Sequence, residues 1–362
     1  MSRSNLGVTR LASTLVLDAV ADPADLLGHF APYGTSSGRG ARRELALRLY
    51  GAEATIRREG DRVVILAEAE DAGSLATMKY MIAYTVCHAL GADESVVRWS
   101  GEGAGTSDLP QFRELRVVDS WNVTPGMRRV RLGGRDLARF ARGGLHIRLL
   151  IPPAGRAPVW PHAGPAAIPV WPEGEARLTV RVYTIRRIVP EEGLLDIDVV
   201  LHEGASPGGD WARNARAGDV VGIMGPGGDD TLPADRLLLA GDETALPAIA
   251  RILEELPEEA TGAALIEIPC EEDRQEIRRP PGVELVWLPR GGRAAGTTGL
   301  LSQALLARAN DGGDADMFRW SGSEFGDFQR LRHHCRKVLK LPRDRHSVTA
   351  YWRRGVDPHD EG

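Results

Sequence analysis

The stretch Leu237-Leu-Leu-Ala-Gly-Asp-Glu-Thr-Ala-Leu-Pro-Ala248 decides the fold class of the last third of the chain. Its first four residues form a continuous apolar run, which is typical of a strand buried on both faces of a parallel sheet. Thr244 is expected to cap a helix that carries Pro247 in its first turn. A buried strand followed by a tight turn and a helix predicts an α/β unit.

The same strand and helix pattern continues along residues 234–362. The apolar residues at positions 249, 252, 253 and 256 follow the spacing of one buried helix face. Further strands are predicted at 264–268, 283–288, 317–320 and 348–352, and further helices at 300–309 and 325–339. We therefore predict a parallel α/β sheet over residues 234–362.

Residues 111–233 show a different pattern, in which short strands are divided by turns. Examples of the predicted strands are 113–124, 127–132, 178–184, 194–202 and 219–224. Several short strands with turns between them predict a small antiparallel β-barrel. The segment 157–172 carries five prolines, so we expect a long exposed loop there.

Residues 1–100 mix strand and helix patterns. An alternating stretch at 62–67 predicts a strand, and an apolar residue at every fourth position predicts a helix over 75–90. We therefore predict a small α+β domain.

The next stretch, residues 101–110, is rich in small residues. It contains Gly101-Glu-Gly-Ala-Gly105, which is similar to a glycine-rich phosphate loop but leads to Pro110 instead of a helix. We interpret these residues as a linker, and expect the chain from residue 106 onwards to fold alone.

The composition excludes several classes of protein. The chain has 362 residues, of which 43% are hydrophobic and 26% charged, and its net charge is −5. That charge argues against a nucleic-acid binder and against a membrane-surface protein. Residues 1–10 contain no apolar segment of the kind that a signal peptide needs, and the longest uncharged run, 157–172, carries too many prolines for a membrane helix.

The three cysteines are too few and too widely spaced for a disulfide framework, a zinc site or an iron–sulfur cluster. A cytoplasmic location is expected from them. His333-His334-Cys335 is similar to a metal motif, but adjacent helical residues point about 100° apart. Cys335 falls in an apolar stripe, so we expect it in the core and both histidines at the surface or its rim, with no metal site.

The stretch Arg181-Val-Tyr-Thr184 holds the first candidate site. On an alternating strand Arg181 and Tyr183 share one side, and Val180 and Val182 are expected to face the barrel core. A guanidinium beside a phenol ring suits the pyrophosphate and the ring system of FAD. The other interpretation of these four residues is a solvated Arg–Tyr pair.

Further motifs follow in order. They are Asp196-Ile-Asp-Val-Val-Leu-His202, Pro207-Gly-Gly-Asp-Trp-Ala212, Gly225-Pro-Gly-Gly228, Leu239-Ala-Gly-Asp-Glu-Thr244, Trp320-Ser-Gly-Ser-Glu324 and Tyr351-Trp-Arg-Arg-Gly355. With them the chain, over about residues 112–355, resembles the siderophore-interacting protein family of FAD-dependent ferric-siderophore reductases. Residues 11–99 resemble a small domain of uncharacterised function that occurs alone or ahead of such reductases.

The resemblance implies a ferredoxin-reductase-like arrangement, with an FAD-binding barrel at 111–233 and an NAD(P)H-binding α/β domain at 234–362. It implies that Arg181 holds the FAD phosphates, that Tyr183 lies against the flavin ring and that Thr184 hydrogen-bonds near the flavin N5 edge. The other cofactor contacts that it implies are His202, Gly204, Pro207, Gly208, Gly209 and Trp211 for FAD, and Asp242, Glu243 and Thr244 for the nicotinamide cofactor. The chain departs from the family at Glu203 and Ser206, where glycine is usual. The acidic Asp242-Glu243 pair would disfavour a 2′-phosphate, but NADH and NADPH both stay open.

The resemblance also implies a ferric siderophore as substrate, received by a small basic cluster. This chain keeps Arg148 but has Gly227 and Ser347 at the two other basic positions. Arg345 and Arg353 are the remaining candidate substrate contacts. Because this cluster has fewer basic residues than the family pattern, fewer cations are available to attract a trianion. We therefore predict a preference for weakly charged ferric complexes.

The implied function is the reduction of ferric siderophores, with electrons passing from NAD(P)H through FAD to Fe(III) so that Fe(II) is released. The cofactors carry this chemistry, so no catalytic side chain is expected. Two alternatives stay open: a general flavin reductase that serves a protein partner, and a non-catalytic flavin- or ligand-binding protein. The sequence does not indicate an oligomeric state.

Overall fold

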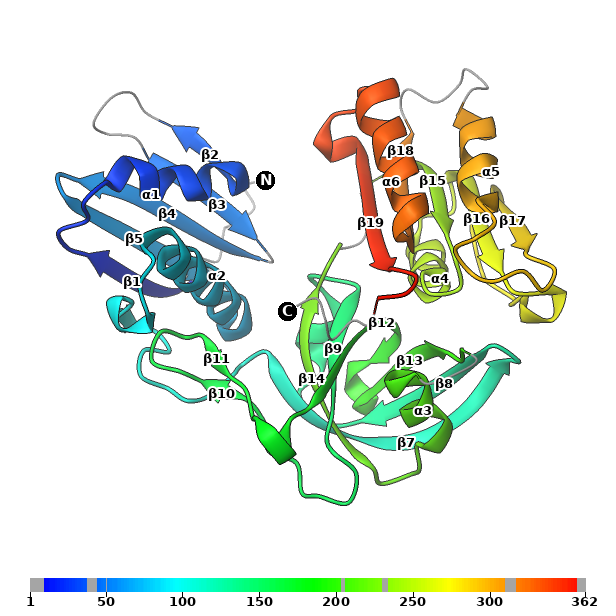
Figure 1. Cartoon of the computed structure of the whole chain (residues 1–362), viewed down its shortest axis with the longest axis horizontal. Helices are drawn as coiled ribbons and strands as arrows, with labels where there is room; N and C mark the ends of the chain where they lie inside the picture. The colour runs from blue at the N-terminus through cyan, green and yellow to red at the C-terminus, as the bar shows by residue number, and fades with distance from the viewer. Residues whose placement is uncertain are drawn as a thin grey trace, which may run out of the picture. The chain divides into compact units, whose positions relative to one another are not determined.

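The computed structural model describes residues 10–37, 44–49, 51–202, 206–229, 234–309 and 317–356. The chain forms two compact units (Figure 1). Unit 1 contains Met1–Phe112 and Pro152–Leu178, and unit 2 contains Arg113–Ile151 and Thr179–Gly362. The chain therefore contributes to unit 1 twice, with part of unit 2 in between.

Unit 1 is a six-stranded antiparallel sheet with helices packed on it, which confirms the predicted α+β class. Its strands are β1 (Leu11–Leu17), β2 (Gly34–Ser37), β3 (Glu44–Leu49), β4 (Ala52–Glu59), β5 (Arg62–Ala69) and β6 (Trp99–Gly101), in the order β2-β3-β4-β5-β1-β6. The strands alternate between buried and more exposed positions, as a sheet covered on one face requires.

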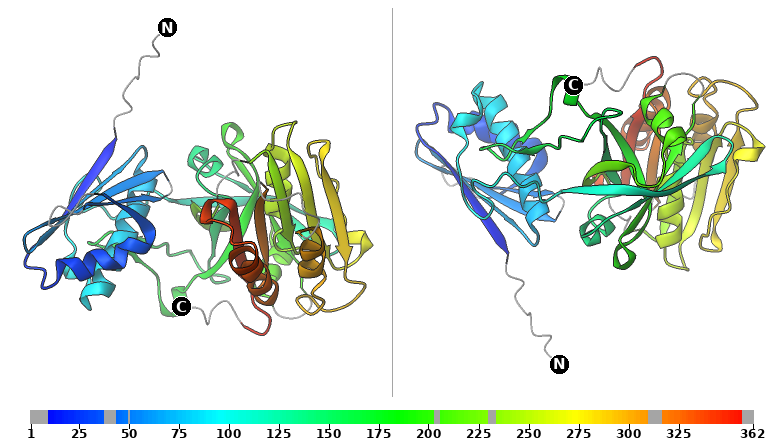
Figure 2. Two further views of the ribbon diagram at one scale, coloured as in Figure 1. Left: turned by 90° about the horizontal axis from the view of Figure 1, so that it is seen from above. Right: turned by 90° about the horizontal axis from the view of Figure 1, so that it is seen from below.

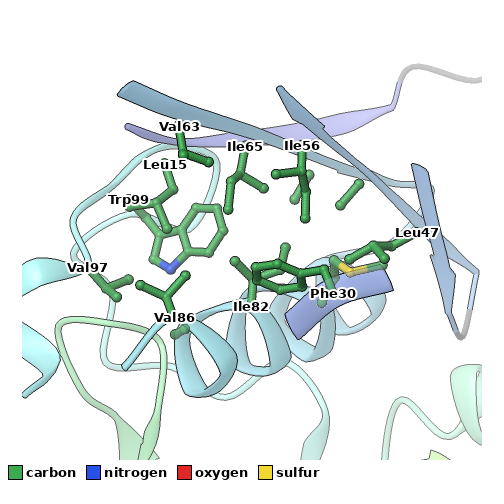
Figure 3. Packing of buried hydrophobic residues seen from close by; sticks show 14 of the residues in the cluster. Leu15, Phe30, Leu47, Ile56, Val63, Ile65, Ile82, Val86, Val97 and Trp99 are labelled. Atoms are coloured by element: carbon green, nitrogen blue, oxygen red, sulfur yellow. The ribbon is translucent and has the colours of Figure 1, made fainter. Parts of the chain in front are cut away.

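Helices α1 (Pro23–Phe30) and α2 (Ala72–Leu90) pack on this sheet. Helix α2 begins after Asp71, whose carboxylate accepts hydrogen bonds from the first-turn amides, and it ends at Gly91 in the left-handed conformation. Ile82 and Val86 of this helix point toward sheet residues such as Ile65 (Figure 3). The apolar residues of α2 thus form one buried face, as the sequence predicts.

The segment 152–178 belongs to unit 1, although the strands before and after it belong to the barrel of unit 2. It contains the short hairpin of β10 (His162–Ala163) and β11 (Pro169–Val170) (Figure 1). Ala166 is fully buried in the core of unit 1, and its carbonyl accepts a 3.0 Å hydrogen bond from Trp99 Nε1. The prediction of an exposed loop is wrong here, because the prolines flank small apolar residues that pack in the core of unit 1.

The barrel of unit 2 closes as predicted from six antiparallel strands. They are β7 (Phe112–Thr124), β8 (Met127–Gly133), β9 (His146–Ile151), β12 (Thr179–Val189), β13 (Leu194–Val200) and β14 (Val220–Gly227), in the order β12-β13-β8-β7-β14-β9. Strand β9 is absent from the predicted set. Helix α3 (Pro207–Asn214) follows β13 and packs on it.

Strand β12 corrects the predicted assignment of its two faces. Val182 is 64% exposed, whereas Tyr183 packs against the barrel core. Ile185, which is fully buried in that core, sets the alternation of the strand, so Tyr183 and Arg181 share its side. The predicted common side of Arg181 and Tyr183 holds, but Val182 points away from the core.

The α/β sheet follows the barrel and has five parallel strands, as the opening stretch of sequence predicts. They are β15 (Arg236–Gly241), β16 (Thr261–Ile268), β17 (Gly282–Pro289), β18 (Phe318–Glu324) and β19 (His346–Trp352), in the order β17-β16-β15-β18-β19. Helix α4 (Leu246–Glu255) packs with Leu237 and Leu239 on one face. Helices α5 (Leu300–Ala309) and α6 (Phe325–His333) pack with Leu238 and Ala240 on the other (Figure 2).

Helix α6 continues as a π-helix over His334–Val338. Cys335 is 1% exposed, as predicted, but His334 is also buried and burial lowers its pKa, whereas Val338 is exposed. The wider π turn shifts the faces by about one residue, so the predicted surface position of His334 is wrong. Across the described ranges, no helix is both long enough and apolar enough to cross a membrane.

The inserted segment yields a prediction about truncation. Ile151 and Thr179 are paired across β9 and β12, so a two-residue Asn-Gly turn can join them directly. We expect residues 113–362 with this turn in place of 152–178 to elute as a single species and to unfold cooperatively in urea.

The position of this segment replaces the expectation that residues 106–362 fold alone: with the segment kept, that chain should aggregate or unfold at lower urea, because Ala166 loses its partners in unit 1. Size-exclusion chromatography and urea titration compare the two chains. Equal behaviour would show that the segment does not depend on unit 1.

Candidate functional site

The first candidate site lies where β12 meets the start of α3. A Cβ atom on Gly208 would lie 2.0 Å from the Tyr183 hydroxyl and 3.5 Å from Arg181 Cγ. The helix therefore begins directly against the Arg181 and Tyr183 side of the strand, and only glycine fits at that point. Burial raises the pKa of Tyr183 to about 12, so its phenol is neutral. A guanidinium, a neutral aromatic ring and a helix N-terminus lie together here.

The start of α3 is built by short-range hydrogen bonds. Ser206 is the N-cap, and its hydroxyl accepts a 3.3 Å hydrogen bond from the Gly209 amide. Pro207 occupies the first turn, and Asp210 accepts a 3.1 Å hydrogen bond from the Ser206 amide. These residues form a compact turn in which Ser206 has a structural role. That the turn binds a phosphate, as the resemblance implies, stays a prediction.

The remaining predicted FAD contacts have different surroundings. His202 is exposed, and its carbonyl accepts a hydrogen bond from Arg213. Trp211 packs against the barrel core, and Thr184 is 4% exposed and pairs with His146 across β12 and β9. Gly204 lies outside the described residues.

Asp242, directly after β15, accepts four hydrogen bonds at the edge of the α/β sheet. Its Oδ1 accepts hydrogen bonds from the amide and the hydroxyl of Thr244, at 3.0 and 2.5 Å. Its Oδ2 accepts from the Glu324 amide at 3.1 Å and from Trp352 Nε1 at 2.8 Å. Asp242 therefore ties together the carboxyl ends of three adjacent strands, β15, β18 and β19. Thr244 serves Asp242 and does not cap α4, whose N-cap is Ala245.

The neighbouring Glu243 points into a second buried network. Arg290 donates to both carboxylate oxygens of Glu243, at 2.6 and 2.7 Å, and lies 3.4 Å from Glu267. Glu267 also accepts hydrogen bonds from Thr298 and from the Leu301 amide. All three charged residues are at most 6% exposed. The carboxylates of Asp242 and Glu243 are thus both engaged in internal contacts of the α/β sheet. Their effect on a 2′-phosphate stays a prediction.

A third cluster joins the barrel to the α/β sheet. Asp229 Oδ2 accepts hydrogen bonds from Trp320 Nε1 at 3.0 Å and from the Ser347 hydroxyl at 2.5 Å. Tyr351 and His146 share a 2.8 Å hydrogen bond, and the Tyr351 and Trp320 rings pack edge to face. Asp229 was missed by the sequence reasoning, although it follows the Gly225–Gly228 motif directly. Trp320 is 1% exposed and is a buried strand aromatic.

The His146–Tyr351 pair is uncharged at neutral pH. Burial lowers the pKa of His146 to about 4 and raises the pKa of Tyr351 well above its usual value. Gly228 has a φ of +81°, and a Cβ there would lie 2.4 Å from His146 Nδ1. The glycine-rich turn thus leaves room for the imidazole at this junction.

The three predicted substrate arginines do not form one cluster. Arg148 is exposed on β9, on the side of the strand that also carries His146. Arg353 is exposed and its guanidinium lies 4.7 Å from the Phe325 ring centroid. Arg345 precedes β19 and Arg353 follows it, so a strand of seven residues, roughly 23 Å long, separates them.

Among the residues that the structure describes, no three His, Cys, Asp or Glu side chains are grouped as they would be around a metal ion. Cys87, Cys270 and Cys335 are all free thiols.

Asp242 yields a prediction about stability. Burial, together with the Glu243 carboxylate, raises the pKa of Asp242 to about 7. Because this pKa is raised above the unfolded value of about 4, the Asp242 contribution to the free energy of unfolding falls as pH rises from about 4 to about 7. Asn at this position cannot titrate, and its amide group would face the donors of Glu324, Trp352 or Thr244.

We expect Asp242→Asn to lose about 1–3 kcal/mol of stability and to lack this part of the pH dependence. Urea unfolding between pH 4 and 8 measures both effects, with the exposed Asp344→Asn as the matched control. A pH profile parallel to that of the wild type would contradict the assignment.

Two family models match the chain, over regions that contain the barrel and the α/β sheet. Residues 116–230 match the siderophore-interacting FAD-binding domain, and residues 234–355 match the siderophore-interacting protein model. Neither match includes residues 1–115.

Named relatives agree with these matches. The chain is 34% identical to the ferric vibriobactin reductase ViuB of Vibrio cholerae over 253 residues, which is 67% of this chain and 90% of that protein. It is 30% identical to the NADPH-dependent ferric-chelate reductase of Escherichia coli over 250 residues, 67% of this chain and 93% of that protein. The crystal structure of the siderophore-interacting protein SipS from Aeromonas hydrophila aligns with a TM-score of 0.58 and 31% identity, covering 69% of this chain and 94% of that one. The chain belongs to the siderophore-interacting protein family, and its barrel is the FAD-binding domain of that family.

Proposed function

We propose that this protein reduces ferric siderophores with electrons from NAD(P)H, through FAD. The observation that carries the proposal is the position of Gly208, which brings the N-terminus of α3 against Arg181 and Tyr183 within a matched FAD-binding domain. The two relatives named as reductases act, by their names, on ferric vibriobactin and on ferric chelates.

The residues present fit FAD. Arg181 would hold the pyrophosphate, because its planar guanidinium can donate two parallel hydrogen bonds to phosphate oxygens. The α3 N-terminus, free of a side chain at Gly208, would add backbone amides and the positive end of the helix dipole. The neutral Tyr183 ring would cover one side of the flavin and exclude water from it.

The chemistry that FAD would supply here is hydride acceptance from a nicotinamide and one-electron transfer to ferric iron. The carboxyl ends of β15, β18 and β19 would receive the nicotinamide cofactor, because open parallel sheets bind ligands at that edge. Asp242 and the Glu243–Arg290 pair hold this edge in place without presenting a free charge to the nicotinamide. This arrangement is compatible with either NADH or NADPH as the electron donor.

A general flavin reductase that serves a protein partner is the second candidate, because the barrel and the sheet are common to such enzymes. One experiment separates the two. We expect the purified full chain to show flavin absorption that bleaches with NAD(P)H and recovers when a ferric chelate is added without oxygen. Bleaching without this recovery would favour the second candidate, and the absence of flavin binding would contradict both.

A separate measurement, the affinity for FAD, tests the role of Arg181. Arg181→Ala should bind FAD about ten- to a hundredfold more weakly, because it removes a charge-assisted contact to phosphate. Arg187→Ala is the matched control, since Arg187 is exposed on the same strand. FAD titration followed by flavin fluorescence gives both affinities. Wild-type affinity in Arg181→Ala would overturn the assignment.

The surroundings of Ser347 support a preference for weakly charged ferric complexes, such as hydroxamates. Where the family is expected to place a cation, Ser347 donates to the Asp229 carboxylate, so the local charge is negative. Two unit charges at about 6 Å interact by about 3 kcal/mol at an effective dielectric near 20. The presence of Ser347 in place of a cation therefore weakens the binding of a trianion most.

We expect a neutral ferric hydroxamate to be reduced with a higher kcat/KM than a trianionic tris-catecholate, with little dependence on salt. Steady-state rates over a salt series measure both quantities. A faster trianion whose rate falls steeply with salt would show that other cations receive the substrate.

A further inference from the structure

Unit 1 contains a pocket of about 220 Å³ that the proposed reductase chemistry does not use. One wall is a stripe of helix α2, formed by Ala72, Leu75, Ala76 and Lys79. The opposite walls are Trp99, the loop of residues 102–110, and residues 163–167 of the inserted segment. All of these residues belong to unit 1, so the pocket is complete within it.

Lys79 is the one buried lysine among the three of the chain. It is 3% exposed, whereas Lys337 and Lys340 are exposed. Its Nζ donates to the carbonyl oxygens of Glu102 and Gly103, at 3.2 and 3.0 Å, and lies 5.4 Å from the Trp99 ring centroid. The glycine-rich loop that is similar to a phosphate loop therefore turns carbonyls, not amides, toward a cation. Two of the loop amides, those of Glu102 and Ala104, donate to backbone carbonyls.

The charge of Lys79 is incompletely balanced. In the part of the chain that the structure describes, no carboxylate lies within ion-pair distance of its Nζ. Burial lowers the pKa of Lys79, and the more distant Glu102 carboxylate opposes this only in part. Glu102 and Asp108 line the pocket but are exposed, so water screens them. An ammonium has three N–H donors, and the two carbonyls account for two of them.

The size and the walls of the pocket indicate the kind of molecule that completes this arrangement. An apolar cavity of about 150 Å³ holds benzene in a protein, so 220 Å³ accommodates a benzene ring with one small substituent. Leu75, Trp99, Leu109 and Pro165 offer apolar surface to such a ring. A carboxylate would supply the missing counter-charge and accept the third N–H of Lys79.

We propose that unit 1 binds a small aromatic carboxylate, with its carboxylate on Lys79 and its ring between α2, Trp99 and the inserted segment. The ligand is a monoanion of about the size of benzoate. The proposal does not depend on the reductase function, because every lining residue lies outside the barrel and the α/β sheet.

Benzoate is the probe, and the full chain labelled with ¹³C at the ε position of lysine is the sample. The chain has three lysines, so the NMR spectrum should contain three assignable signals. We expect the Lys79 signal to titrate at a lower pH than the other two, and benzoate to shift it saturably and raise its titration midpoint. Benzamide has the same shape without the charge, and should bind about tenfold or more weakly in calorimetry.

Lys79→Met should abolish benzoate binding, whereas the exposed Lys337→Met should leave it unchanged. If Lys79→Met does not fold, the comparison of benzoate with benzamide on the wild-type chain still tests whether binding needs the carboxylate. Equal binding of the two probes, no saturable binding of benzoate in the millimolar range, or a shift confined to Lys337 and Lys340 would each overturn the proposal. Flavin content and reductase activity are recorded on the same samples, so a failure of the reductase assignment is seen separately.

Discussion

The carboxylate of Asp242 is the constraint on which the arrangement of the α/β sheet depends. Four donors from its own turn, from the end of β18 and from the end of β19 meet on its two oxygens. Since a buried carboxylate without these partners would be costly, the three strand ends and the carboxylate must be in place together. The Glu243–Arg290–Glu267 network does the same for the ends of β16 and β17. The edge that would receive a nicotinamide is therefore organised by buried charge.

A second group of contacts makes the barrel and the sheet one compact unit. Arg186 of β12 pairs with both oxygens of Glu254 in α4, and Arg251 of α4 donates to the Ile185 carbonyl. Asp273 accepts hydrogen bonds from Thr124 and from the Gly126 amide. Met127 and Leu145 of the barrel also lie in the core beneath α4. A flavin held by β12 and a nicotinamide held by the sheet would thus be positioned by one continuous scaffold.

The sequence predicts what depends on local periodicity, and misses what depends on long-range contacts. The strands and helices of the α/β sheet follow from apolar runs, and the barrel follows from short strands between turns. The direction of Val182 does not follow from its apolar character, because the buried Ile185 fixes which side of β12 faces the core. The burial of His334 depends on a π turn, which no residue type in this stretch predicts. The roles of Asp229 and Lys79 depend on partners more than 20 residues away.

The burial of Ala166 in unit 1 has a consequence for the order in which the protein is made. Trp99 and Ala166 are 67 residues apart, and strands β7, β8 and β9 of the barrel lie between them. At a synthesis rate of about 5–20 residues per second, Ala166 is added roughly 3–13 s after Trp99. The core of the first unit therefore stays open until half of the barrel has been synthesised. Unlike domains that fold one after another on the ribosome, these two units must complete their folding in an interleaved order.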